Sequence, residues 1–367
     1  GQPVLWVGTG GFGLSRFEKG HWITYTTKSG LPDDSVWSLL ETSSTAGVKT
    51  LWIGMASRGG LAKLETGKWI SFNTESGLPN NAVFSIMESK ISKDASSFWV
   101  GTDGGLGYWE NGTWTTYNVK SGLPNNTVRA LLETKEKDGR KITWIATEGG
   151  LVKIDKGVWK VFDVNSGLPS NRIYCLLSTI DKEGELVLWA GTREGLACFE
   201  NGIWHNYNIN NSKLPNNIVR TLLATYDQNG QEKIWIGTES GLACLKSGEW
   251  LANNLPDQRI RALLKVRDVN KDWLWVGTDG GVFWTEIKDS LSDWQWLSDT
   301  TTPAIPNNTI YQVMSDKENR IYISTNKGVV RLTKINTDKI SKDNYSIYNF
   351  TTKDGLPNNE CNSGASL

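Results

Sequence analysis

The sequence contains little histidine and no excess of charge of either sign, and these two features exclude several kinds of function. Only two histidines occur, and 39 basic residues balance 39 acidic residues among 367 positions. A balanced charge lacks the basic footprint of a nucleic-acid-binding protein and gives no general attraction to anionic lipid. Because no run of about 18 apolar residues is present, we expect no insertion into a membrane.

Cysteine is scarce as well, and its four copies show no CxxC spacing. A zinc site or a redox motif is therefore not expected. Cys198 and Cys244 occupy equivalent places in "GLACFE" and "GLACLK", where other copies of the segment carry an apolar residue. We expect both to be buried as small hydrophobic side chains. Cysteine usage alone does not indicate whether the protein works in a reducing or an oxidising compartment.

Linear motifs of catalysis are missing. The sequence has no GxSxG, HExxH or P-loop motif and no GxGxxG that opens a helix. His21 and His205 each lie beside a tryptophan of a repeated segment, and the acids Asp181 and Glu183 fall in a predicted hairpin turn. We expect no catalytic residue and no cofactor. A glycan-active hydrolase or lyase, with carboxylates that converge from different repeats, is kept as a less favoured alternative.

One segment has the spacing of a calcium loop. "DVNKD", residues 268–272, places oxygen-bearing side chains at alternate positions, but the glycine turn and the later bidentate glutamate are missing. A polar hairpin turn explains the segment, so no metal site is predicted.

What the sequence has in abundance is repetition. The aromatic residue of an "LWIGT" segment recurs at intervals of 40 to 47 residues, at Trp6, Trp52, Trp99, Trp144, Trp189, Trp235, Trp275 and Tyr322. The proline of an "LPNN" segment recurs in step with it, at Pro32, Pro79, Pro124, Pro169, Pro215, Pro256, Pro306 and Pro357. Periods of this length are typical of propellers or of helical arrays.

Four short β-rich runs fill each period. In the third period they are "TVRALLET" from Thr127, "ITWIAT" from Ile142, "GLVKID" from Gly150 and "VWKVFDV" from Val158. Gly, Asn or Pro separates such runs, and none has helical periodicity over ten residues or more. This pattern predicts an all-β fold, a β-propeller of four-stranded antiparallel blades, in which neighbouring blades cover each other's apolar faces. The repeated tryptophans are then expected to be core packing.

The order of the runs predicts how the propeller closes. The chain begins with a second strand and ends with "NECNSGASL", which is similar to a first strand. We expect residues 1–367 to form a single domain of eight blades, whose ring is closed by pairing of the N- and C-terminal strands. Seven blades with one surplus repeat is the alternative. Because the sequence begins inside a repeat, we also expect it to be a piece of a longer protein.

The segment "SGLPNNTVRALLETKEKDGRKITWIATEGGLVKIDKGVWKVFDV", from Ser121 to Val164, resembles the two-component regulator propeller repeats of bacterial sensor proteins. Their pattern is "GLPxNxVxxIxxDxxGxLWIGTxxGLxRYDxxxxxFxxY", and the likeness covers essentially the whole chain. The closing "GLPNNECNSGA" is similar to the variant that this family uses near the end of its repeat array. Kelch and WD40 repeats match less well. Two features depart from the family pattern, since the turns between first and second strands are unusually long and no output domain is visible.

The resemblance implies a periplasmic or extracellular ligand-sensing module, often upstream of a histidine kinase or a similar output domain. In the best-known branch of the family the ligands are oligosaccharides. Output domains or a second propeller in the parent protein are then the expected partners.

A ligand must be recognised where the repeats differ. The third residue after each "LPNN" segment forms one variable column: Trp37, Phe84, Arg129, Tyr174, Arg220, Arg261, Tyr311 and Asn362. The turn that follows the Gly-Thr of each second strand forms another, with the pair Ser57-Arg58, Asp103, Glu148, the pair Arg193-Glu194, Glu239, Asp279 and the pair Asn326-Lys327. The predicted topology places both columns on one face, at the mouth of the central channel.

Two structural explanations compete with a ligand site at these columns. Strand pleating would direct the aromatic side chains between blades, and the acids would pair with neighbouring arginines. Aromatic planes beside Arg and Asp are nevertheless the chemistry that binds sugars or small anionic ligands. The favoured function is a non-catalytic sensor propeller that binds a small polar ligand such as an oligosaccharide at the channel mouth. A protein–protein interaction scaffold is the alternative.

Overall fold

The chain folds into eight four-stranded antiparallel sheets. The computed structural model describes residues 4–90, 96–227, 229–253, 255–256, 258–268, 271–289, 291, 293–335, 344–356, 358 and 361–366. In these residues, strands are joined by turns and one-turn 3-10 helices. The protein is a β-propeller with eight blades, which confirms the predicted fold class and excludes the seven-bladed alternative. None of the helices in these ranges has the length and apolarity needed to cross a membrane.

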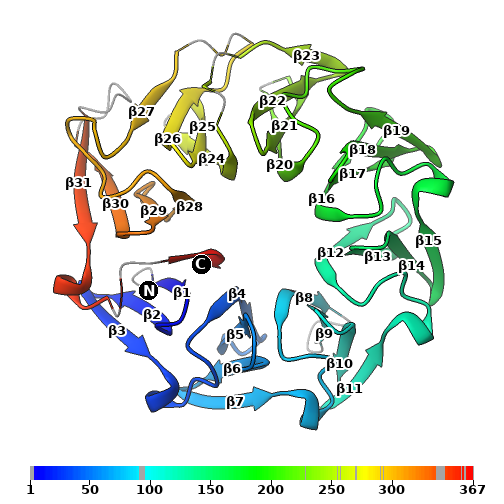
Figure 1. Cartoon of the computed structure of the whole chain (residues 1–367), viewed down its shortest axis with the longest axis horizontal. Helices are drawn as coiled ribbons and strands as arrows, with labels where there is room; N and C mark the ends of the chain where they lie inside the picture. Colours follow the sequence, from blue (N-terminus) through cyan, green and yellow to red (C-terminus); the bar gives the residue numbers. More distant parts are fainter. Residues whose placement is uncertain are drawn as a thin grey trace. The chain divides into compact units, whose positions relative to one another are not determined.

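The described residues divide into two compact units of four blades each. The continuous unit comprises residues 25–207 (Figure 1). Its blades are β4 (Val36–Ser43), β5 (Lys49–Met55), β6 (Leu61–Glu65) and β7 (Lys68–Phe72); β8 (Val83–Lys90), β9 (Ser96–Thr102), β10 (Leu106–Glu110) and β11 (Thr113–Tyr117); β12 (Val128–Lys135), β13 (Lys141–Thr147), β14 (Leu151–Asp155) and β15 (Val158–Phe162); and β16 (Ile173–Ile180), β17 (Leu186–Thr192), β18 (Gly195–Glu200) and β19 (Ile203–Tyr207).

The split unit comprises residues 1–24 and 208–366. Its blades are β1 (Leu5–Thr9), β2 (Leu14–Glu18), β3 (His21–Tyr25) and β32 (Cys361–Ser366); β20 (Val219–Tyr226), β21 (Glu232–Thr238), β22 (Gly241–Lys246) and β23 (Glu249–Leu251); β24 (Ile260–Asp268), β25 (Lys271–Thr278), β26 (Gly281–Glu286) and β27 (Gln295–Leu297); and β28 (Ile310–Ser315), β29 (Ile321–Thr325), β30 (Gly328–Lys334) and β31 (Tyr345–Phe350).

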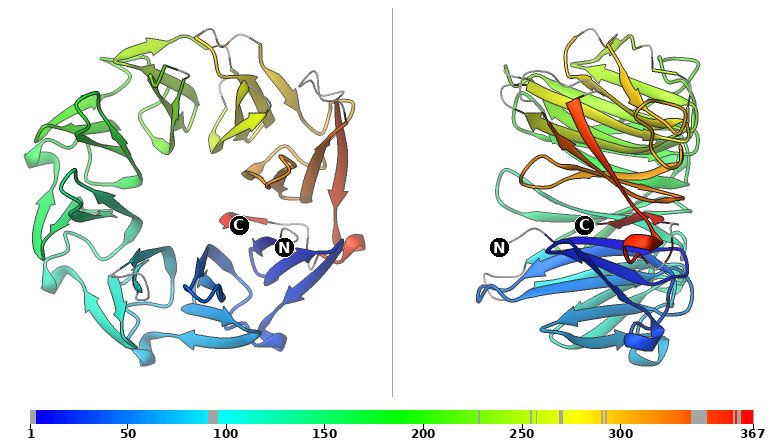
Figure 2. Two further views of the ribbon diagram at one scale, coloured as in Figure 1. Left: turned by 180° about the vertical axis from the view of Figure 1, so that it is seen from behind. Right: turned by 90° about the vertical axis from the view of Figure 1, so that its left-hand side faces the viewer.

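Both ends of the chain contribute to one blade of the split unit. The C-terminal strand β32, red in Figure 2, pairs antiparallel with the blue strand β1, with Val7 opposite Ser366 and Thr9 opposite Cys361. The predicted pairing of the N- and C-terminal strands is confirmed. The pairing gives β1 a neighbour on both edges, which removes an exposed edge that would promote aggregation.

The tryptophan of each second strand is buried, as predicted. Trp144 is 1% exposed and donates from Nε1 to Thr134 Oγ1 at 3.0 Å, and Trp235 is fully buried and donates to Thr225 Oγ1 at 2.9 Å. The hydrogen bond satisfies the one polar atom of an otherwise apolar side chain. The remaining members of this column, Trp6, Trp52, Trp99, Trp189, Trp275 and Tyr322, are buried too.

The crossover between blades repeats one set of hydrogen bonds. Before β12, the 3-10 helix η3 (Val119–Ser121) ends at Gly122, whose φ of 106° lies in the left-handed region that favours glycine. Asn125 Oδ1 accepts from the backbone N–H of Thr127 at 2.8 Å, and Asn126 Oδ1 accepts from the first N–H of η3 at 2.9 Å. The repeated Leu-Pro-Asn-Asn segment therefore has the architectural role that its repetition indicated.

Close packing between blades explains the glycine of the repeated Trp-Ile-Gly-Thr segment. A Cβ added at Gly101 would lie 2.4 Å from Ser85 Oγ in the same blade and 2.7 Å from Val128 Cγ1 in the next blade. Both distances are shorter than a normal non-bonded contact. The equivalent position in the next blade is Ala146, which is fully buried, so that blade accommodates a methyl group where this one does not.

We expect Gly101→Val to lower the free energy of unfolding by about 2 kcal/mol, because the added methyl groups overpack the contact between two blades. The reverse type of change at the equivalent position, Ala146→Gly, should cost only about 1 kcal/mol, since it removes one buried methyl group. Chemical denaturation followed by tryptophan fluorescence measures both variants. A Gly101→Val protein as stable as the parent chain would contradict the close packing of Gly101 against Val128.

Candidate functional site

The variable column of the first strands consists of bulge residues. In the blade of β12, Val128 lies opposite Thr147 and Ala130 lies opposite Ala146, so Arg129 is an extra residue without a partner in β13. The same register shift occurs at Trp37, Phe84, Tyr174, Arg220, Arg261 and Tyr311. A β-bulge interrupts the regular alternation of side chains and re-aims the extra one.

The bulge determines how exposed these side chains are. Trp37 is 41% exposed, and the other six bulge side chains are half-buried. Of the two neighbours of Arg129 in the strand, Val128 is fully buried and Ala130 is half-buried. Packing between blades therefore leaves the aromatic members of the column partly exposed. Asn362 also belonged to the predicted column, but its side chain lies outside the described residues.

Antiparallel pairing brings the second variable column next to the first, because the start of a first strand adjoins the end of the second strand. Arg129 donates to Glu148 Oε1 from Nε at 3.1 Å and from Nη2 at 2.7 Å. The corresponding pairs in other blades are Arg220 with Glu239 at 2.5 Å, Arg261 with Asp279, and Tyr311 Oη with Asn326 Oδ1 at 2.7 Å. The expectation that acids in this turn pair with neighbouring arginines is confirmed for Glu148, Glu239 and Asp279.

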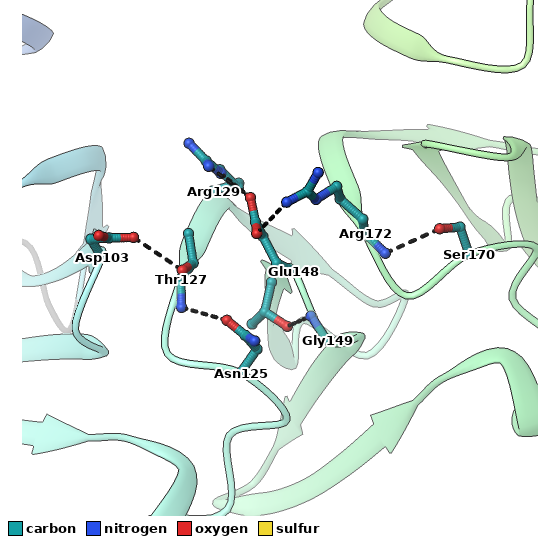
Figure 3. A network of polar contacts seen from close by, with 9 residues as sticks. Asp103, Asn125, Thr127, Arg129, Glu148, Gly149, Ser170 and Arg172 are labelled. Carbon is teal, nitrogen blue, oxygen red and sulfur yellow. Dashed lines mark hydrogen bonds and ion pairs between the residues drawn. The ribbon is translucent and has the colours of Figure 1, made fainter.

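The turn acids also bond to residues of the next blade (Figure 3). Arg172, which immediately precedes β16, donates from Nη2 to Glu148 Oε2 at 2.7 Å, so two arginines from different blades share one carboxylate. Asp103 accepts from Thr127 Oγ1 at 3.0 Å in the same manner. In the split unit, Arg259 Nε lies 3.2 Å from Glu239 Oε2.

Sequence reasoning did not select Arg172 and Arg259. Each stands two residues before a bulge residue, Tyr174 or Arg261, in the segment that follows "LP". A comparison of this position among repeats gives Ser35, Ala82, Thr127, Arg172, Ile218, Arg259 and Thr309, and the two arginines stand out. This comparison could have identified the two arginines from the sequence. Their bonds to Glu148 and Glu239 could not be predicted, because each of these acids belongs to the preceding blade.

In the continuous unit three of the four bulge side chains contact one another from blade to blade. The rings of Trp37 and Phe84 are 5.9 Å apart in an edge-to-face arrangement, and the guanidinium of Arg129 lies 4.6 Å from the centre of the Phe84 ring. Tyr174 occupies the bulge position of the next blade. We call Trp37, Phe84, Arg129 and Tyr174 the bulge row. It presents half-exposed aromatic rings beside a fixed cation.

Two arginines of the predicted site are not drawn into these pairs. Arg58 and Arg193 are exposed, and within the described ranges neither side chain has a hydrogen-bond or ion-pair partner. The backbone N–H of Arg193 donates to the carbonyl of Arg172 at 3.1 Å. Arg193 and Arg172 therefore leave adjacent backbone positions at the same end of one blade.

The electrostatic environment keeps Glu148 ionised. Partial burial alone would raise the pKa of its carboxyl group, but hydrogen bonds and charge from Arg172 and Arg129 outweigh burial and lower the pKa below its usual value. A lowered carboxyl pKa stabilises the fold above the pKa of the unfolded chain, and this contribution is lost as the pH falls through the folded pKa. An ionised carboxylate bound by two cations is unsuited to act as a general acid.

The histidines and cysteines do not belong to the bulge row. His21 and His205 are exposed on the fourth strands β3 and β19. Cys198 and Cys244 are buried as predicted, and burial raises the pKa of the Cys244 thiol to about 12, so that it stays protonated. Cys361 is the fourth cysteine, and its side chain lies outside the described residues.

No metal cluster is found among the residues that the structure describes. The candidate calcium segment is only partly included, because residues 269 and 270 lie outside the described ranges. Its two acids are engaged with lysines: Asp268 bonds to Lys334, and Asp272 Oδ2 lies 2.8 Å from Lys265 Nζ.

Comparisons with known proteins support the fold. No family model and no curated protein matches the chain. Among solved structures, the chain is similar to the extracellular domain of BT4673 from B. thetaiotaomicron, described as a one-component system, with 22% identity and a TM-score of 0.47 over 95% of this chain and 45% of that one. It is also similar to the extracellular domain of BT3049 from the same organism, described as a hybrid two-component system, with 17% identity and a TM-score of 0.45 over 97% and 64%.

A third similar structure is streptogramin B lyase, with 16% identity and a TM-score of 0.51 over 80% of this chain and 91% of that one. At this identity the likeness to the lyase shows the fold alone. The chain spans less than two thirds of the length of both extracellular domains that it matches.

We expect Arg172→Gln to raise the pKa of Glu148, because one of the two cations that oppose the effect of burial is removed. Carbon-13 NMR titration of the glutamate carboxyl groups, with Glu148 assigned from a Glu148→Gln spectrum, measures the shift. Arg140→Gln, which removes an arginine that bonds to Asp155 instead, is the control and should leave Glu148 unchanged. An identical Glu148 titration in the parent chain and in Arg172→Gln would show that the shared ion pair does not form.

Proposed function

We propose that the chain is a non-catalytic, ligand-binding sensor module of a bacterial signalling protein, and that it binds a small polar ligand such as an oligosaccharide along the bulge row of the continuous unit. The observation that carries this proposal is the contact between Trp37, Phe84 and Arg129. Aromatic rings with exposed area bind the apolar faces of sugars, and a guanidinium beside them donates hydrogen bonds to hydroxyl or carboxylate groups.

Preorganisation favours binding at this row. Arg129 is held by Glu148 in its own blade and by the ring of Phe84 in the preceding blade. Side chains fixed before the ligand arrives lose less conformational entropy when it binds. The acids that adjoin the row are paired with arginines, which suits them to positioning and not to proton transfer.

The signalling role rests on the resemblance of the repeats to two-component regulator propellers. A periplasmic or extracellular location, and output domains or a second propeller elsewhere in the parent protein, belong to the same proposal. The pattern carried by "SGLPNNTVRALLET" and "ITWIATEGGLVKID" supports them.

A glycan array followed by calorimetry on any glycan that binds tests the proposal. Trp37→Ala and Phe84→Ala should each weaken binding by about 10-fold, which corresponds to about 1.4 kcal/mol. Trp296→Ala is the matched control, because Trp296 is 51% exposed on the fourth strand β27 of the split unit and does not belong to the bulge row, and this variant should bind as the parent chain does.

Unchanged affinity in both row variants would exclude the bulge row as the binding site. Absence of binding to every glycan, combined with capture of one specific protein from the native host, would favour the protein-interaction scaffold instead.

A further inference from the structure

Positive charge exceeds its local partners at one end of the bulge row. Arg129 and Arg172 share the single carboxylate of Glu148, and Arg193 has no side-chain partner within the described ranges. Three guanidinium groups from two neighbouring blades are thus matched by one bonded carboxylate. Glu194 follows Arg193 and is exposed, and none of its side-chain atoms bonds to these arginines.

In the corresponding place of the split unit, every arginine is bonded to a carboxylate. There Arg220 and Arg259 bond to Glu239, and Arg261 bonds to Asp279. Two carboxylates thus bind three guanidinium groups, and each guanidinium is bonded to one of them. The difference arises because the blade of β16 carries Tyr174 at its bulge and Arg193 in the turn where its neighbours carry an acid.

The paired arginines keep hydrogen-bond donors for a ligand. A guanidinium has five N–H groups. Arg129 uses Nε and Nη2 on Glu148, and Arg172 uses Nη2. Their side chains remain 33% and 38% exposed. Glu148 holds both guanidinium groups in place, which reduces the entropy lost on binding an oxyanion.

We infer that the ligand of this row is anionic, and that a carboxylate or sulfate group on a saccharide binds between Arg172 and Arg193 with Arg129 beside it. The inference rests on the proposed function and specifies the class of its ligand. An oxyanion accepts paired N–H donors from guanidinium groups more strongly than a neutral hydroxyl does. Tyr174, two residues after Arg172 in the chain, and Phe84, next to Arg129, supply ring surface for the attached sugar.

Calorimetry with four probes tests the inference: maltotetraose, tetragalacturonate, a chondroitin sulfate tetrasaccharide and inorganic sulfate. We expect one of the two acidic tetrasaccharides to bind at least ~10-fold more tightly than maltotetraose, and its affinity to fall as sodium chloride rises from about 50 to about 300 mM, since the site is partly exposed and screened by salt. The acidic tetrasaccharide that binds more tightly identifies whether the anion is a carboxylate or a sulfate.

Arg193→Gln is the decisive variant, because its exposed side chain bonds to nothing in the described part of the chain and its loss leaves the fold intact. It should weaken binding of the acidic tetrasaccharide by about 10-fold, and Arg193→Lys should restore part of the loss. Arg140→Gln, with the same change of charge at the opposite end of the neighbouring blade, should have no effect.

The outcomes separate this inference from the proposed function. Equal binding of neutral and acidic tetrasaccharides, or full affinity in Arg193→Gln, contradicts the anionic ligand while an oligosaccharide sensor stands. Binding of inorganic sulfate alone, lost in Arg193→Gln, supports the anion site and contradicts the oligosaccharide ligand. Failure of all four probes to bind contradicts the inference.

Discussion

The extra residue at the start of each first strand is the constraint on which the variable surface depends. In a regular strand, Arg129 would alternate with Val128 and Ala130, and its direction would be set by the pleat. The bulge places two residues opposite one and releases Arg129 from that alternation. Val128 is then free to pack against Gly101 of the preceding blade while Arg129 stays half-exposed. One irregularity therefore serves both the packing of blades and the presentation of variable side chains.

Most of the architecture was predictable because it depends on residues that every repeat shares. The spacing of Trp52 and Trp99 indicated the period, the hydrogen bonds of Asn125 and Asn126 follow from turn chemistry, and "NECNSGASL" indicated the pairing of β32 with β1. The columns of the candidate site were also visible as positions that vary. The direction of their side chains was not predictable. A bulge depends on how two strands pair, so the sequence of one strand does not reveal it. Arg172 was missed for a related reason, since its partner Glu148 belongs to another blade.

Ion pairs at the ends of the strands contribute more to position than to stability. Exposed pairs of this kind are worth about 0–1 kcal/mol each, whereas the buried second-strand tryptophans and the apolar residues around them stabilise the blades. The pairs do fix the torsions of long side chains. Arg129 is held from two sides by Glu148 and Phe84, and Arg172 is held by the same carboxylate. A stable, repetitive framework thus carries a small set of side chains that differ from blade to blade, and we propose that this set recognises the ligand.

Hydroxyl-radical footprinting with mass spectrometry tests the central claim most directly, because it measures the solvent exposure of individual aromatic side chains in the native chain. The bulge geometry predicts rapid oxidation of Trp37 and detectable oxidation of Phe84 and Tyr174, with strong protection of the second-strand residues Trp52, Trp99 and Trp189 in the same blades. Equal protection of the two sets would mean that the bulge side chains are packed between blades, and it would contradict their assignment to a surface that binds a ligand.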